Sequence, residues 1–493
     1  MLNIETLSKS SDLFTFILGF SVLALIAFGV ITWFIDRTQT KHSLRRNFPV
    51  LARGRWFMEY IGHFFRYYMV ANDREERPFN RTDRTWSYKA AKGNKTTEAF
   101  GSTLDLKDIE YSFVNSPYPF IPQTEEDNLP SAITYGEKTK NPYTTQSRIN
   151  ISGMSYGALS DVAVLSLSKG AHKGNFLMNT GEGGLSKFHK DGNAPLIFQI
   201  GTAKYGCSNE DLTINTDKLS LLAKNDQIKM FEIKLSQGAK PGKGGILPAD
   251  KVTKEIAEAR GIQEGTASIS PNRHIEVDSD ETLLELIFKV KKYSEKPTGI
   301  KFCLGSPEHL DSLFELMNEK KQLEDGHLYI PDFITLDSSD GGTGAAPMAH
   351  MDAMGMNIKH SLPVLIAKLN EYNLRSDIKV IASGKLITPV QAAWAFSCGV
   401  DSINIGRGFL FSLGCIQARV CNKNKCPTGI TTHNKKYTKG LIPEDKYQRV
   451  YNYHRTLTKE LMGIAHSCGV KGFDKLNSKH IRYHETIKIK NLS

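Results

Sequence analysis

Three of the seven cysteines lie within twelve residues, at Cys415, Cys421 and Cys426, and the third is followed by Pro427. Three thiolates on one loop can hold a cluster of three irons, and a Cys-Pro pair at the last ligand is typical of ferredoxin-like sites. Zinc is the alternative metal, but a structural zinc usually takes four ligands, and His433 is the nearest candidate for the fourth. The spacing therefore favours an iron–sulfur cluster over zinc and over three unrelated buried cysteines.

Two glycine-containing segments upstream of these cysteines could bind a phosphate group. They read Ser383-Gly384-Lys385 and Gly406-Arg407-Gly408. Glycine lets the backbone approach a ligand closely, and an arginine can hold two phosphate oxygens through parallel hydrogen bonds. These segments predict a phosphate site, and by themselves they fit a phosphorylated substrate as well as a flavin nucleotide.

The elements that must position these residues are eight short apolar runs, which alternate with longer helix-like stretches from about residue 148 onward. The runs are INISGMS from 149, FLMNTG from 176, PLIFQIG from 195, KMFEIKLS from 229, PTGIKFCLG from 297, FITLDSS from 333, KVIASG from 379 and SINIGRG from 402. This alternation predicts parallel strands joined by helices. Eight such strands favour a closed (β/α)8 TIM barrel over an open doubly wound sheet.

Polar and glycine-rich residues occur at or just after the C-terminal ends of these runs. The C-terminal ends of barrel strands meet at one rim, where active sites form, so we expect these residues to share a pocket. A single glycine-rich turn could be ordinary turn chemistry, but eight turns in phase are hard to explain that way. The residues expected to bind a cofactor at this rim are Met154, Ser155, Gln199, Lys301, Gly341, Gly342, Thr343, Ser383, Gly384, Lys385, Gly406 and Arg407.

Long segments of residues 150–435 resemble the FMN-binding domain of glutamate synthase. In chain order they are ISGMSYGALS, NTGEGG, KLSQGAKPGKGG, KVTKEIAEAR, DGGTGAAP and GCIQARVCNKNKCPTG. With its N-terminal apolar segment and the sequence HSLRRNFPVLARGRWFMEYIG, the chain is similar to the stand-alone, membrane-attached members of that family. The resemblance therefore covers most of the chain.

The resemblance implies FMN over the C-terminal mouth of the barrel, a [3Fe-4S] cluster on the three cysteines, and reduction of a 2-iminoglutarate formed from 2-oxoglutarate and ammonia. The positions that match the family's 2-oxoacid site are Glu182, Lys234, Gln237, Lys240 and Arg260. Glu182, Gln237 and Lys240 are expected to be catalytic, and Lys234 and Arg260 to bind substrate. Cations suit the carboxylates of a dicarboxylate, and Glu182 could orient the incoming nitrogen or shuttle a proton. A single lysine, however, is more often a solvated surface charge.

The chain departs from the family pattern at residues 242–249, which read GKGGILPA where glutamate synthase usually has GEGGQLPG. Ile246 replaces a polar side chain near the expected 2-oxoacid, so the substrate need not be 2-oxoglutarate. The sequence shows no glutaminase domain and no G-x-G-x-x-G between a strand and a helix with a downstream acid. We therefore expect a separate source of ammonia, and an electron donor such as a ferredoxin or another redox protein.

Two other functions fit parts of the pattern. An FMN enzyme of another small acid, such as a hydroxy-acid oxidase, or a phosphate-ester isomerase would use the same barrel rim but would not explain the three-cysteine loop. A membrane-tethered electron relay without a small substrate would explain both cofactors, and Ile246 is compatible with it.

Residues 13–35 contain no charged side chain. As a helix they would span roughly 34 Å, enough to cross the hydrocarbon core of a membrane. We predict a transmembrane anchor; a cleaved signal peptide is the alternative, but no basic segment precedes the run and no small-residue cleavage site follows it. Arg37, Lys41, Arg45 and Arg46 follow at once, so the positive-inside rule places the body in the cytoplasm.

The overall composition agrees with a large, partly membrane-associated enzyme. With 493 residues, 40% of them apolar, the chain can bury a large core. Its net charge of +11 is spread along the chain without a basic helix or an RNA-binding motif, which favours an anionic membrane surface over nucleic acid as the partner. The odd number of cysteines argues against the disulfide framework of a secreted protein.

We divide the chain into four parts. They are an anchor at 1–36, a mostly irregular and partly helical collar at 37–147, the FMN-binding barrel at 148–435 with its iron–sulfur loop at 415–426, and a C-terminal helical extension at 436–493.

Overall fold

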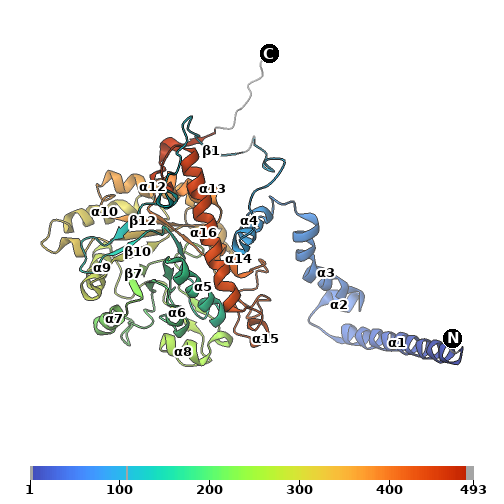
Figure 1. Ribbon diagram of the computed structural model, residues 1–493. Coiled ribbons are helices and arrows are strands. Elements are labelled where there is room, and N and C mark those ends of the chain that lie inside the picture. Colours follow the sequence, from blue (N-terminus) through green and yellow to red (C-terminus); the bar gives the residue numbers. More distant parts are fainter. Residues whose placement is uncertain (1–3, 107–108, 485–493) are drawn as a thin grey trace, which may run out of the picture. The chain divides into compact units, whose positions relative to one another are not determined.

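The computed structural model describes residues 4–106 and 109–484 (Figure 1). The chain forms two compact units, Met1–Arg81 and Thr82–Ser493. The second unit contains the predicted barrel and all the predicted site residues.

Eight parallel strands close into a barrel in the second unit. The strands are β4 (Ile149–Ile151), β5 (Met178–Asn179), β6 (Leu196–Ile200), β7 (Ile228–Lys234), β10 (Thr298–Phe302), β11 (Phe333–Asp337), β12 (Lys379–Ser383) and β13 (Ser402–Ile405). They follow one another around the barrel in chain order, and β13 pairs with β4 to close it. Seven strands lie within an apolar run and β7 begins one residue before its run, so the predicted TIM barrel is confirmed.

Helices surround the strands and bury their outer faces (Figure 1). The helices that follow barrel strands are α5 (Asp161–Gly174), α6 (Lys187–Gly192), α7 (Thr216–Ala223), α9 (Asp280–Ser294), α10 (His309–Lys320), α12 (Ile358–Glu371), α13 (Pro389–Ser397) and α14 (Arg407–Leu413). Every residue of β6 is buried, as expected for a parallel strand covered on both faces. The side chain of Ser160 accepts a hydrogen bond from the Ala163 amide and caps the start of α5.

The long connection between β7 and β10 carries an insertion above the C-terminal rim. It contains the hairpin of β8 (Ile246–Leu247) and β9 (Ser268–Ile269), the short helix η3 (Ala249–Lys251) and α8 (Lys254–Arg260). The connection between β10 and β11 holds η4 (Gly326–Leu328), and that between β11 and β12 holds α11 (Met348–Ala353).

A hairpin of β2 (Ile133–Tyr135) and β3 (Tyr143–Thr145) packs against the N-terminal end of the barrel. Tyr135 is fully buried, and its hydroxyl is 2.6 Å from Ser402 Oγ. Ile133 and Tyr135 belong to one core cluster with barrel residues, among them Phe333. The collar prediction contained helix but no strand, so this hairpin is an addition to it.

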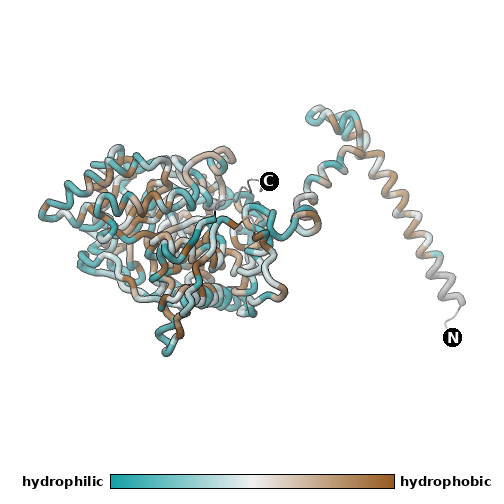
Figure 2. Tube along the Cα trace, turned by 90° about the horizontal axis from the view of Figure 1, so that it is seen from above, coloured by the Kyte–Doolittle hydropathy of each residue, from teal (hydrophilic) through white to brown (hydrophobic). Residues whose placement is uncertain are grey.

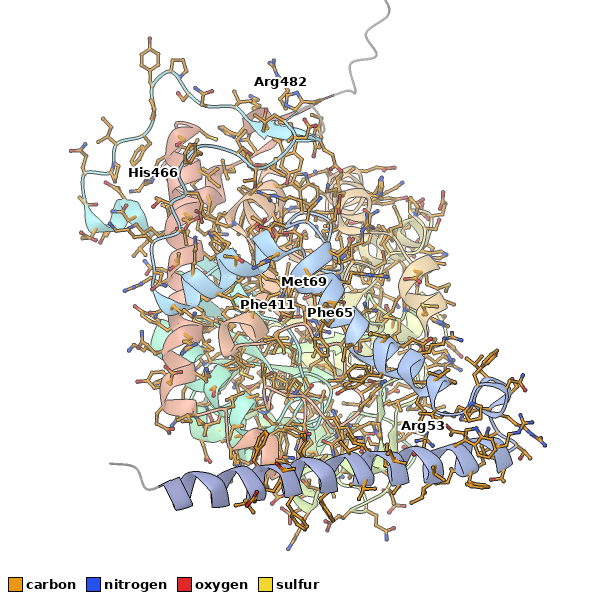
Figure 3. The ribbon with its side chains drawn as sticks, turned by 90° about the vertical axis from the view of Figure 1, so that its right-hand side faces the viewer. Arg53, Phe65, Met69, Phe411, His466 and Arg482 are labelled. Atoms are coloured by element: carbon orange, nitrogen blue, oxygen red, sulfur yellow. The ribbon has the colours of Figure 1, made fainter. Side chains whose placement is uncertain are left out.

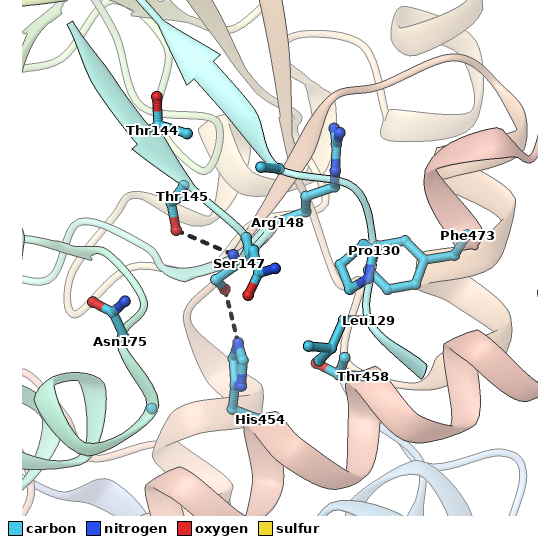
Figure 4. Close-up of a pocket in the computed structure, with 13 residues that line it drawn as sticks. Leu129, Pro130, Thr144, Thr145, Ser147, Arg148, Asn175, His454, Thr458 and Phe473 are labelled. Atoms are coloured by element: carbon cyan, nitrogen blue, oxygen red, sulfur yellow. Dashed lines mark hydrogen bonds between the residues drawn. The ribbon is translucent and has the colours of Figure 1, made fainter. Parts of the chain in front are cut away.

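A cavity of about 340 Å³ opens at the same N-terminal end (Figure 4). Ser147, His454 and Thr458 are among its lining residues. His454 Nε2 lies 2.9 Å from Ser147 Oγ, and the imidazole stacks on Phe176 with 4.0 Å between ring centroids. Burial lowers the pKa of His454 to about 3, so this imidazole is neutral. The cavity lies at the end of the barrel opposite the predicted site.

Segments from both ends of the second unit pack on the barrel. The additional elements are α4 (Arg81–Lys92), β1 (Tyr111–Phe113), η2 (Glu125–Asn128), α15 (Lys435–Thr438), α16 (Pro443–Ser467), η5 (Phe473–Lys475), η6 (Ser478–His480) and β14 (Ile481–Tyr483). The helix α16 packs against α5, α13 and α14, and it buries Tyr453, Leu457 and Leu461. β14 pairs antiparallel with β1, which joins the end of the described chain to the collar.

All the regular secondary structure described in the first unit is helical. It consists of α1 (Ile4–Thr38), α2 (Ser43–Asn47), α3 (Leu51–Phe65) and the π-helix η1 (Arg66–Val70). Residues Asp12–Thr38 of α1 are long and apolar enough to cross a membrane, and Figure 2 shows the apolar character of this helix. By length and composition the helix agrees with the predicted anchor.

Candidate active site

A buried ion pair stands at the C-terminal rim of the barrel. Glu182 follows β5, and Lys234 is the last residue of β7. Their side chains meet with 3.0 Å between Lys234 Nζ and Glu182 Oε2. Lys234 Nζ also donates to Gln237 Oε1 at 3.4 Å. Three of the five residues expected at the 2-oxoacid site are therefore in direct contact.

The charges around Glu182 keep its carboxylate ionised. Burial alone would raise the pKa of Glu182, but the positive charges of Lys234, Lys240 and Arg260 outweigh it and hold the pKa below its usual value. Burial lowers the pKa of Lys240, although the negative charge of Glu182 acts to raise it. Lys240 Nζ donates a hydrogen bond to the Gly244 carbonyl at 3.0 Å. The site therefore collects one carboxylate and three cations in a water-poor position.

Arg260 is the last residue of α8, and its side chain is buried. Nη1 donates to Ser268 Oγ at 2.8 Å, and Nη2 donates to the Tyr156 carbonyl at 3.3 Å. The guanidinium also lies over the ring of Tyr205, 5.1 Å from the centroid. Its Nε is buried and finds no hydrogen-bond partner among the described residues. A buried donor of this kind is suited to an anionic ligand.

A second buried ion pair lies in the barrel mouth. Lys301 Nζ is 3.2 Å from Asp337 Oδ2, and that oxygen also accepts a hydrogen bond from the Gly238 amide at 3.0 Å. Burial opposes the charge on Lys301, but Asp337 and then Glu232 outweigh it and raise the pKa of Lys301. Lys301 is therefore a fixed positive charge at the position expected for the cofactor.

Glu232 was missed by the sequence-based prediction. It lies inside the barrel on β7 and is fully buried. Its Oε1 accepts hydrogen bonds from Asn179 Nδ2 at 2.8 Å and from Gln199 Nε2 at 2.7 Å, and its Oε2 accepts one from Thr335 Oγ1 at 2.6 Å. The sequence feature that could have identified Glu232 is its position inside the apolar run KMFEIKLS. Charged residues are rarely buried without partners, so a carboxylate in a buried strand indicates a polar network.

The loop after β11 meets Arg407, which follows β13, and the loop after β12 lies against Ser338 at the end of β11. Arg407 Nη2 donates to the Thr343 carbonyl at 3.1 Å. A Cβ atom on Gly342 would lie 2.8 Å from Arg407 Nε, and one on Gly384 would lie 2.0 Å from Ser338 Oγ, so glycine allows both side chains to approach the backbone closely. Ser383 is buried beside them, whereas Lys385 is exposed.

Met154 and Ser155 lie between the two groups of residues. A Cβ on Gly406 would be 3.7 Å from Met154 Sδ, and one on Gly183 would be 2.9 Å from Ser155 Cβ and 3.3 Å from Arg260 Nη2. The structure thus places the residues expected for the 2-oxoacid and those expected for the phosphate around one rim. Their roles there remain predictions.

The cysteine loop follows α14 and is tied down by side chains from elsewhere in the second unit. Tyr88 donates to the Cys415 carbonyl at 2.5 Å, and Lys251 Nζ donates to the carbonyls of Cys421 at 2.9 Å and Thr431 at 2.8 Å. Among the residues whose positions are described, no three His, Cys, Asp or Glu side chains form a ready metal site. His433 Nε2 instead forms a 2.9 Å hydrogen bond with the Gly157 carbonyl, so it is engaged by the fold.

Comparison with known proteins gives the family. Residues 105–471 match the conserved region in glutamate synthase. The chain belongs to the glutamate synthase family. It is 36% identical to the glutamate synthase large subunit-like protein YerD of Bacillus subtilis, over 96% of this chain and 95% of that protein. The predicted resemblance to glutamate synthase and the prediction of an oxidoreductase of this family are confirmed.

More distant members of the glutamate synthase family match part of the chain. The archaeal-type glutamate synthase [NADPH] of Thermotoga maritima is 32% identical over 69% of this chain, and the match spans 63% of that protein. The ferredoxin-dependent glutamate synthase of Cyanidium caldarium is 29% identical over 73% of this chain and 23% of that protein. Among solved structures, a flavocytochrome b2 variant matches with a TM-score of 0.47 and 12% identity, over 89% of this chain and 88% of that one.

Proposed function

We propose that this member of the glutamate synthase family uses FMN and a [3Fe-4S] cluster to reduce a 2-imino acid, formed from ammonia and a 2-oxoacid such as 2-oxoglutarate. In the reverse direction it would oxidise a CH–NH2 donor. The observation that carries the proposal is the contact between Glu182 and Lys234, with the charges of Lys240 and Arg260 acting on the same carboxylate.

The side chains of this site suit a dicarboxylate substrate that carries nitrogen. Lys240 and Arg260 supply positive charge for the carboxylates, and Arg260 Nε has a free donor among the described residues. Glu182 Oε2 is paired with Lys234, so Oε1 is the oxygen that would accept or return a proton at the substrate nitrogen. The side chain of Ile246, which departs from the family pattern, is exposed. The preference for a dicarboxylate therefore depends on the positive charges of Lys240 and Arg260.

The residues of the barrel mouth fit FMN. Arg407, which lies beside Gly342, would hold its phosphate. Lys301, held by Asp337, would favour negative charge on the reduced ring. When bound, FMN would supply the hydride for the imine carbon.

Replacing Arg407 by alanine is expected to weaken FMN binding about 10–100-fold, because a charge-assisted hydrogen bond contributes about 1.5–3 kcal/mol. Titration of the deflavinated full-length protein with FMN, followed by flavin fluorescence, measures the change. Lys439→Ala, which removes an equal charge from an exposed position, is the control and should bind FMN normally. Equal affinity in both variants would refute a phosphate role for Arg407.

The three thiols of the 415–426 loop would hold the [3Fe-4S] cluster. The loop follows α14, whose first residue is Arg407. The cluster ligands are therefore close in sequence to the residue proposed to bind the FMN phosphate. A ferredoxin or another redox protein would deliver electrons, and a separate source would deliver ammonia. The name of the ferredoxin-dependent relative supports the first of these partners.

Replacing Cys421 by serine is expected to abolish the cluster while the barrel still binds FMN, because serine is a poor ligand for an iron–sulfur centre. Iron and acid-labile sulfide per chain, together with the electron paramagnetic resonance signal of the oxidised protein, report the loss. Cys398→Ser is the matched control, since Cys398 lies at the end of α13, outside the loop. Iron content that stays unchanged in Cys421→Ser would contradict the assignment.

We further propose that α1 anchors the protein in a membrane with the catalytic body in the cytoplasm. We also propose the division of the chain into an anchor that ends at residue 36, a collar that ends at 147, a barrel that ends at 435 and a C-terminal extension. A protease-protection assay on intact cells should show a C-terminal tag protected. Digestion of that tag by protease added outside the cells would show that the catalytic body lies on the outer side, and would contradict the proposed orientation.

The test of the whole proposal is an anaerobic titration. Purified full-length protein should be yellow-brown and release FMN on denaturation, and the reduced protein should recover its oxidised flavin spectrum on addition of 2-oxoglutarate and ammonium. Reoxidation by a redox protein but by no 2-oxoacid with ammonium would identify an electron relay instead. A folded, colourless, flavin-free protein would end the proposal.

A further inference from the structure

The helix α3 in the first unit has an exposed apolar face. At 3.6 residues per turn, residues 51, 54, 57, 58, 61, 64 and 65 lie within one half of the helix, and none of them is polar. Four of these side chains are largely exposed: Leu51 by 80%, Phe57 by 58%, Met58 by 63% and Phe65 by 56%. Such a face, left in water, needs a partner.

The exposed apolar surface continues beyond α3. In η1 the side chains of Tyr68, Met69 and Val70 are also exposed, and Figure 3 labels Phe65 and Met69 along this segment. The opposite side of α3 carries Arg55 and Glu59, which form an ion pair one turn apart. The middle of the helix is therefore amphipathic.

The start of α3 is fixed to the end of α1. Both carboxylate oxygens of Asp36 accept hydrogen bonds from Arg53, from Nε and Nη2, each at 2.8 Å. The amide of Val50 donates to the same carboxylate at 3.1 Å. Asp36 follows the last residue of the uncharged run 13–35. With α1 inserted, α3 would thus begin at the boundary between hydrocarbon and headgroups.

The charge around α3 is complementary to anionic lipid. Residues 36–66 contain seven Lys and Arg residues and two acidic residues. Arg45 lies over the ring of Trp56, 4.7 Å from the centroid. Basic residues combined with exposed aromatic and aliphatic side chains on one helix are typical of elements that lie in a membrane interface.

We propose that α3 and η1 lie in the headgroup layer of an anionic phospholipid bilayer, with Leu51, Phe57, Met58 and Phe65 in contact with the acyl chains. The inference goes beyond the proposed reaction and rests on the proposed insertion of α1. Lipid is favoured as the occupant because the face is continuous with a helix able to span a membrane and is surrounded by positive charge. The apolar face of α3 is then a second membrane contact of the protein.

Photolabelling of the full-length protein tests the inference. The protein is reconstituted into vesicles of phosphatidylcholine and phosphatidylglycerol that contain a lipid with a diazirine in its acyl chain. After illumination, mass spectrometry should find lipid adducts on peptides from 48–70 as well as from 13–35. Adducts on 13–35 alone would overturn the inference and leave the anchor standing, whereas the absence of adducts from both would overturn the anchor too.

Matched variants sharpen the test. Phe57→Ser combined with Met58→Ser should lower the adduct yield on 48–70 about fivefold and leave the yield on 13–35 unchanged, because it removes the apolar contact of one turn. Glu59→Gln, on the polar face, should label like the wild type. Vesicles of phosphatidylcholine alone should lower the yield on 48–70 about threefold, because the positive charge then has no anionic partner. Equal yields in both lipids would overturn the assignment to an anionic membrane.

Discussion

Replacing Glu182 by glutamine is expected to lower kcat by about 10²–10³, because the variant keeps the size of the side chain but cannot accept a proton or carry charge. In the wild type, Lys234, Lys240 and Arg260 hold the pKa of Glu182 below its usual value against the effect of burial. The carboxylate is therefore ionised at neutral pH and available as a proton acceptor. Stopped-flow reoxidation of the reduced flavin by 2-oxoglutarate and ammonium measures the effect.

The same variant separates chemistry from binding. Without the negative charge of Glu182, the three neighbouring cations are less neutralised, so KM for the 2-oxoacid should stay the same or fall while kcat falls. FMN content should not change. Glu258→Gln on the exposed face of α8 is the control and should turn over normally. If Glu182→Gln retains more than about a tenth of the wild-type kcat, Glu182 is not the proton-transfer group.

Replacing Glu232 by glutamine is expected to lower the free energy of unfolding by about 3 kcal/mol, the cost of leaving buried donors without acceptors. Asn179, Gln199 and Thr335 all donate to this carboxylate, and the side chain is fully buried. An amide at this position offers one oxygen and turns its own NH2 group toward donors. Urea unfolding of the detergent-solubilised full-length protein, followed by tryptophan fluorescence, gives the difference.

A functional effect should accompany the loss of stability. Gln199, oriented by Glu232, and Lys301, whose pKa Glu232 helps to raise, both lie in the proposed FMN site. The reduction potential of the bound flavin should therefore shift in Glu232→Gln. Glu210→Gln, at an exposed position, should change neither quantity. A loss of less than about 1 kcal/mol in Glu232→Gln would show that the network relaxes around the substitution.

The sequence alone determined the barrel and the location of its working end. Each of the eight apolar runs coincides with a barrel strand to within one residue at its start, because a strand buried on both faces requires a mainly apolar segment that can be recognised locally. The C-terminal ends of parallel strands meet at one rim whatever the details of packing, so the residues after each run were correctly expected to lie there. The apolar run at 13–35 is likewise a local property, and it forms part of α1.

Only the tertiary structure decided which polar groups are paired inside the barrel. The bond from Thr335 to Glu232 joins residues 103 positions apart, and the one from Gly238 to Asp337 joins residues 99 positions apart. Such pairs depend on the strand register around the closed barrel, which no local pattern encodes. The hydrogen bonds of Tyr135 with Ser402 and of His433 with Gly157 also join residues far apart in the sequence. The exposure of the Ile246 side chain was likewise visible only in the tertiary structure. Residue types and spacing thus determined the candidates for chemistry, while the closed barrel determined their partners, because most buried polar side chains are stable only where the fold brings a hydrogen-bond partner to them.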